Sequence, residues 1–184
     1  MGAFATNRGL CPDDLGRLQE AVAGDLASLI AVCRRFEVPL LAAAMRHTGS
    51  VSEAYPRVEP TLSTLCDELL GGALIPEKWS TRALELLAPR PMGNAELAEE
   101  SEENLSGSLI GEIPRIARRR AVAGALPQLP LPELTAILLR HIRDATAEET
   151  VGLAADSEEA AQQFLERGER QLNEALAAAN VTTD

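Results

Sequence analysis

The chain has 184 residues and a formal net charge of −11, with 17 basic and 28 acidic side chains. This length suits one domain or two small ones, and a hydrophobic content of 46% is enough to build a core. The acidic balance and an aromatic content of 3% count against nucleic acid as the main partner, because phosphates attract cations and unpaired bases stack on aromatic rings. No apolar run predicts a membrane span or a signal peptide, so we expect a cytoplasmic protein without membrane contact.

The first part of the chain has the apolar spacing of helices, with hydrophobic residues three and four positions apart between residues 13 and 45. Gly24 interrupts this pattern and Asp25 is a candidate N-cap, which predicts two helices rather than one. Pro39 is expected to open a third segment, which Gly49 closes. No stretch alternates apolar and polar residues long enough to predict a strand. We therefore predict an all-α fold.

Two more helices are expected before residue 90. One carries an apolar stripe that ends at Gly71-Gly72, and Ser50 is a candidate cap at its start. Pro76 suits the first turn of the other, which is expected to reach about residue 88 with Trp79 facing inward.

The three cysteines are far apart and form no C-x-x-C pair. This spacing favours buried free thiols over a zinc site, so we expect no metal centre. The cysteines are Cys11, Cys33 and Cys66.

The composition changes near residue 90 and predicts a division into three parts. Residues 1–90 form the first part, and residues 91–130 read as a linker with an acidic stretch and a basic helix that holds Arg115 and Arg118 to Arg120. Residues 131–184 form the last part, which has eleven acidic and four basic residues. Short helices are expected there at about 132–142, 146–153 and 157–167, with an extension to about 178.

Two stretches resemble the extracytoplasmic-function (ECF) sigma factors of bacteria. AGDLASLIAVCRRFEVPLLAAAMRHTGS, followed by IPEKWSTRALELLA, resembles the N-terminal domain of that family, and Pro76 and Trp79 stand where the family has its Pro-x-x-Trp. LPLPELTAILLRHIRDATAEETVGLAADSEEAAQQFLERGERQL resembles the C-terminal helix-turn-helix domain. The resemblance covers most of residues 13–178. It implies a sigma-like helical bundle that binds core RNA polymerase and reads the melted promoter, an acidic linker, and a module that docks on the upstream promoter element.

The segment that would contact the polymerase departs from the family. Where the family has an acidic, glutamine-containing helix, this chain has two prolines four residues apart, each costing about 3 kcal/mol inside a helix. They predict a broken or kinked helix and weakened polymerase binding, although a local break without consequence beyond shape is the alternative. The altered contact residues are Ala54, Tyr55, Pro56, Val58, Glu59 and Pro60.

The surfaces that would contact the promoter depart as well. Only Trp79 is able to stack on a base in the N-terminal part, and a core position is the favoured interpretation of this residue. The candidate recognition helix is acidic, and carboxylates repel the DNA backbone, although a glutamine can still pair with adenine. DNA binding is therefore expected to be weak or absent. The candidate promoter contacts are Trp79, Arg82, Gln162, Gln163 and Arg167.

The turn before the candidate recognition helix has Ala155 where a glycine would tolerate a left-handed conformation. Asp156 and Glu159 make a plausible capping box, which predicts a helix start at Ser157.

The resemblance and its departures together favour a transcription regulator that acts by protein–protein contact, as a sigma mimic or a decoy for an anti-sigma factor or another regulator. The alternative is a working divergent ECF sigma factor that directs core RNA polymerase to a promoter, and a plain helical adaptor is the third interpretation. His47 and His141 have no companions at catalytic spacing, and no phosphate loop or nucleophile elbow is present in the sequence. We expect no enzyme activity and no cofactor.

Overall fold

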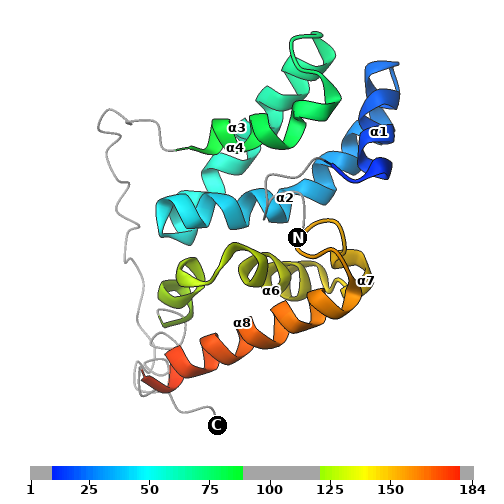
Figure 1. Ribbon diagram of the computed structural model, residues 1–184. Helices are drawn as coiled ribbons and strands as arrows, with labels where there is room; N and C mark the ends of the chain where they lie inside the picture. The colour runs from blue at the N-terminus through cyan, green and yellow to red at the C-terminus, as the bar shows by residue number, and fades with distance from the viewer. Residues whose placement is uncertain (1–9, 89–120, 179–184) are drawn as a thin grey trace, which may run out of the picture.

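The computed structural model describes residues 10–88 and 121–178, and within these ranges the chain is helical (Figure 1). Their one β-type pairing is an isolated bridge between Val151 and Ala155, so the predicted all-α fold class is confirmed. Most of the predicted linker, including its basic helix, lies outside the described residues. The helices are α1 (Pro12–Val22), α2 (Leu26–Thr48), α3 (Val51–Leu70), α4 (Trp79–Leu87), α6 (Leu131–Arg143), α7 (Ala147–Thr150) and α8 (Glu158–Ala178), with 3₁₀ turns at Pro76–Lys78 and Leu126–Gln128.

The corner between α1 and α2 forms as its local signals predict. Gly24 has φ of 107°, a backbone conformation that glycine adopts at little cost. Asp25 caps α2 by accepting a hydrogen bond from the backbone N–H of Ala27 at 3.0 Å, and Gly49 ends the helix in the left-handed region at φ of 71°. The predicted break at Pro39 is wrong, because α2 continues through it with Pro39 itself buried. The apolar contacts of the surrounding turns outweigh a local cost of about 3 kcal/mol.

The predicted break in the next helix is also wrong, because α3 runs without interruption through Pro56 and Pro60. Both prolines are exposed and share one face of α3 with exposed Ser52. The carbonyls of Ser52 and Pro56, which lose their helical donors to the proline rings, therefore lie on the solvent side, where water can satisfy them. The opposite face buries a continuous strip against the core, comprising Ala54, Val58, Thr61, Leu65 and Leu69.

Ser50 occupies the N-cap position of α3, but its side chain makes no capping hydrogen bond. Its hydroxyl instead lies 2.9 Å from that of Ser52, and Thr48 donates a hydrogen bond to the carbonyl of Ser50 at 2.8 Å. The start of α3 is therefore held by the preceding turn, and not by the predicted cap.

Helix α2 is central to the described fold. It packs against α1, α3 and α4 on one side and against α6 on the other, and α8 lies on the side of α6 that faces away from α2 (Figure 1). Phe36 and Met45 of α2 are fully buried, as is Trp79 of α4. The helices on the two sides of the predicted linker are thus in contact, while the division into domains at residues 90 and 130 stays a prediction.

The last three helices differ in length from their predicted ranges. The predicted helix at about 146–153 is the four-residue α7, which begins with a capping box between Thr146 and Glu149. The predicted helix at about 157–167 and its extension are one helix, α8. Ser157 caps this helix by accepting a hydrogen bond from the backbone N–H of Ala160 at 3.2 Å. The left-handed position in the preceding turn is Gly152, with φ of 82°, and not Ala155.

Candidate partner-binding groove

An open groove with a volume of about 510 Å³ lies where α2, α3 and the end of α6 meet. We call it the α3 groove. Its lining surface is mostly apolar, and ten of its twelve lining residues belong to α2 and α3, with the other two at the end of α6. Its lining residues are Glu37, Val38, Leu41, Tyr55, Pro56, Val58, Glu59, Leu62, Ser63, Cys66, Ile142 and Arg143.

Two large apolar side chains of the α3 groove are exposed to solvent. Tyr55 of α3 is 67% exposed and Ile142 of α6 is 57% exposed. They come from helices far apart in the sequence, so the groove depends on the packing of both α3 and α6 against α2, whose lining residues lie in its middle. Exposed apolar side chains that line one concave surface are typical of a binding site, whereas single exposed ones are ordinary.

The predicted polymerase-contact segment divides between the core and this groove. Ala54 and Val58 are buried, and Val58 also forms part of the groove wall. Tyr55, Pro56 and Glu59 are exposed and line the groove. Pro60 is exposed on the same helix but does not line the groove. The segment therefore presents an intact helical surface, in contrast to the broken one that the prolines predicted.

The edge of the α3 groove carries a net negative charge. Arg143 donates a hydrogen bond to Glu37 at 2.7 Å, so this pair contributes little net charge. Glu59 also lines the groove and is exposed. A cationic group beside the apolar part of a ligand would therefore be favoured over an anionic one.

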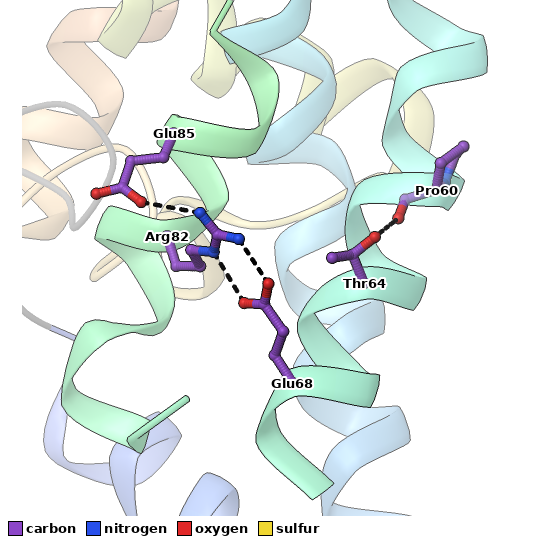
Figure 2. A network of polar contacts seen from close by, with 5 residues as sticks. All are labelled: Pro60, Thr64, Glu68, Arg82 and Glu85. Carbon is purple, nitrogen blue, oxygen red and sulfur yellow. Dashed lines mark hydrogen bonds and ion pairs between the residues drawn. The ribbon is translucent and has the colours of Figure 1, made fainter. Parts of the chain in front are cut away.

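The two predicted promoter contacts of the N-terminal part make their contacts inside the protein. Trp79 is fully buried, so it cannot stack on a base in this conformation, and the favoured interpretation as a core residue agrees with the structure. Arg82 pairs with Glu68, through its Nε at 2.8 Å, and with Glu85 at 3.2 Å (Figure 2). The Arg82 guanidinium holds the pKa of the Glu68 carboxyl below its usual value. Glu68 belongs to α3, so this pair joins α4 to α3.

The predicted promoter contacts of the C-terminal part lie on the exposed face of α8, away from the α3 groove. Gln162 donates a hydrogen bond to Glu166 at 3.0 Å, and Gln163 donates one to Glu159 at 3.5 Å. The Arg167 guanidinium lies 4.9 Å from the centre of the Phe164 ring. The two glutamines thus pair with carboxylates of the same helix, and Arg167 lies 3.7 Å from Glu133 of α6, so these residues do not make a positively charged surface.

Sequence reasoning missed the residues that complete the α3 groove. Leu62 and Cys66 belong to the predicted apolar stripe before Gly71-Gly72, Ile142 ends a predicted helix, and Arg143 lies just beyond it. Periodicity cannot tell which helices meet, so it did not bring these residues together. It also missed that Cys33 and Cys66 come together, with their Sγ atoms 3.4 Å apart. No spacing in the sequence signals that contact, since it depends on the register between α2 and α3.

None of the helices in residues 10–88 and 121–178 is long and apolar enough to cross a membrane. Within the same ranges, no group of three or more histidine, cysteine or acidic side chains is placed to hold a metal ion. No protein-family model matches this chain, and no curated protein matches it.

Proposed function

We propose that the chain is a sigma-like transcription regulator that acts by protein–protein contact. Its α3 groove would bind an amphipathic helix of an anti-sigma factor or of another regulator. The observation that carries the proposal is the pair of exposed apolar side chains, Tyr55 and Ile142, that face one groove from two helices. An amphipathic helix docks in such a groove through apolar anchors spaced along one face. The negative groove edge and the net charge of −11 favour basic residues beside those anchors.

The surfaces that would contact DNA support the same proposal. Trp79 is buried, Arg82 is held by two carboxylates, and the exposed face of α8 is rich in glutamate. A protein that binds DNA neutralises phosphates with Lys and Arg, and carboxylates at the same surface oppose this. A regulator that bound a protein partner without binding promoters would have this distribution of charge.

One observation favours the alternative, a working divergent ECF sigma factor. The unbroken α3 removes the proline argument for weakened polymerase binding, because the helix that the resemblance assigns to the polymerase clamp is intact. The two functions differ in whether the chain binds core RNA polymerase and starts transcription, so the test includes both.

The test measures binding of the purified chain to purified ECF anti-sigma domains and, separately, to bacterial core RNA polymerase. Tyr55→Arg and Ile142→Arg are each expected to weaken binding to an anti-sigma domain by about 2 kcal/mol, roughly a 30-fold loss of affinity. Both side chains are exposed, so the fold is expected to be unaffected. Leu70→Arg is the matched control, because Leu70 is an exposed apolar residue of α3 that does not line the groove.

Three outcomes would contradict the proposal. The first is promoter-dependent transcription by core polymerase in the presence of the chain, which would favour the working sigma factor. The second is loss of anti-sigma binding in Leu70→Arg but not in Tyr55→Arg, which would move the binding surface away from the groove. The third is that no anti-sigma domain binds. A duplex promoter fragment serves as a further probe, and its affinity is expected to be low at low salt and to change little as salt rises.

A further inference from the structure

The thiols of Cys33 and Cys66 face each other across the interface of α2 and α3, with their Sγ atoms 3.4 Å apart. Both side chains are partly buried, and Cys66 also lines the α3 groove. A small oxidant in solvent therefore has a path to one sulfur of the pair. The third cysteine, Cys11, is at the start of α1, where its thiol donates a hydrogen bond to Asp14 at 2.9 Å.

The two thiols differ in how easily they lose a proton. A hydrogen bond from the Cys33 thiol stabilises the Cys66 thiolate and lowers the pKa of Cys66. The same interaction, together with burial, raises the pKa of Cys33. The thiolate is the nucleophile in thiol oxidation, and Cys66 is the sulfur that lines the open groove, so Cys66 is expected to react first and Cys33 to follow.

We propose that Cys33 and Cys66 are a peroxide-sensitive pair that forms a reversible disulfide between α2 and α3. Sulfurs in a disulfide are about 2.05 Å apart, so closing the gap needs a movement of little more than 1 Å. The inference does not depend on the proposed function.

The reaction has two steps. The Cys66 thiolate attacks hydrogen peroxide, so that an S–O bond forms, the O–O bond breaks, and the leaving hydroxide takes up the proton that Cys66 released. The Cys33 sulfur then attacks the Cys66 sulfur, so that the S–S bond forms and the S–O bond breaks. The released hydroxyl leaves as water with the Cys33 proton. Overall, two thiols are oxidised by two electrons and one peroxide is reduced to two waters.

The pair also has a consequence for the α3 groove. A disulfide would hold α2 and α3 together directly beneath the groove and would remove the Cys66 thiol from its lining. Oxidation is therefore expected to fix the separation of the two helices that form most of the groove wall.

The test treats the full chain with hydrogen peroxide, alkylates the remaining thiols and measures the intact mass. The expected result is loss of two hydrogens, one remaining alkylated thiol at Cys11, and a cross-linked peptide that joins Cys33 to Cys66. A dithiol reductant is expected to restore all three thiols. Cys11→Ser is expected to retain the cross-link, whereas Cys33→Ser is expected to leave a sulfenic acid at Cys66 that reacts with dimedone.

Cys66→Ser tests whether Cys66 is the sulfur that reacts first. This variant is expected to form neither the cross-link nor a dimedone adduct at Cys33. Serine is close to cysteine in size, and far-UV circular dichroism checks that each variant remains helical. Full alkylation of Cys33 and Cys66 after peroxide treatment would overturn the proposal. So would a disulfide that involves Cys11, or one that joins two chains.

Discussion

Replacing Trp79 with alanine is expected to lower the free energy of unfolding by about 4 kcal/mol, the range seen when a buried tryptophan is truncated. Trp79 is fully buried and is the largest such side chain in the described core. It begins α4 immediately after the 3₁₀ turn Pro76–Lys78, at a point where that turn contacts α1 and α4 contacts α2 and α3. The void left by alanine would therefore weaken contacts among four helices.

The control for this change is Trp79→Phe, because the indole Nε1 is buried without a hydrogen-bond partner in the described residues. Phenylalanine keeps most of the apolar contact and removes that donor, so its cost is expected to be well below that of alanine. Chemical denaturation followed by far-UV circular dichroism measures both, since the chain has a single tryptophan and each variant loses its fluorescence. A loss below about 1 kcal/mol for Trp79→Ala would show that this side chain does not hold the core together.

Local signals predicted the two ends of α2 well and the interiors of α2 and α3 badly. Asp25 begins α2 as a side-chain cap, and Gly49 ends it in the left-handed region. Both signals are readable from the sequence because capping and left-handed turns depend on a few neighbouring atoms. Pro39, Pro56 and Pro60 were predicted to break their helices because a proline inside a helix removes an amide donor and clashes with a carbonyl, at a cost in free energy. What the sequence does not display is which face each proline occupies, and at Pro56 and Pro60 the solvent-facing position makes that cost small.

The candidate site was predicted only in part, because the sequence does not show which helix faces pack together. Four of the twelve residues that line the α3 groove belong to the segment around Tyr55 and Glu59, which the resemblance had already singled out. The remaining lining residues come from α2, from the rest of α3 and from the end of α6, and they meet only because α3 and α6 both pack against α2. The Cys33–Cys66 contact has the same origin, because it depends on how α2 and α3 slide along each other.

The α3 groove and the acidic face of α8 differ in the kind of partner that they favour. A chain with a net charge of −11 needs a concentrated basic surface to hold DNA, and the exposed face of α8 has glutamates beside each of its candidate base contacts. The apolar groove needs no such surface, because burying Tyr55 and Ile142 against a partner is favourable whatever the sign of the distant charge. The proposed protein–protein contact therefore depends on the exposed apolar side chains of the groove and not on a basic surface.

Replacing Asp14 with alanine is expected to lower the free energy of unfolding by about 3 kcal/mol, because it leaves a partly buried arginine without its partner. The Asp14 carboxylate is 1% exposed and lies 3.1 Å from Nε of Arg35, whose side chain is 28% exposed. Arg35 also donates a hydrogen bond to the carbonyl of Val151 at 3.2 Å. One buried carboxylate thus orients a guanidinium that connects α1, α2 and the turn before α8.

The matched variant is Asp14→Ala combined with Arg35→Met, which removes both charges and keeps the apolar stem of the arginine. Its loss is expected to be smaller than that of Asp14→Ala alone, because no unpaired charge remains in the interface. Urea denaturation of the wild type, both single variants and the double variant gives the coupling between the two residues. If Asp14→Ala and the double variant lost the same free energy of unfolding, this prediction would be wrong. Such a result would mean that leaving Arg35 unpaired costs nothing and that only the contacts of Asp14 itself are stabilising.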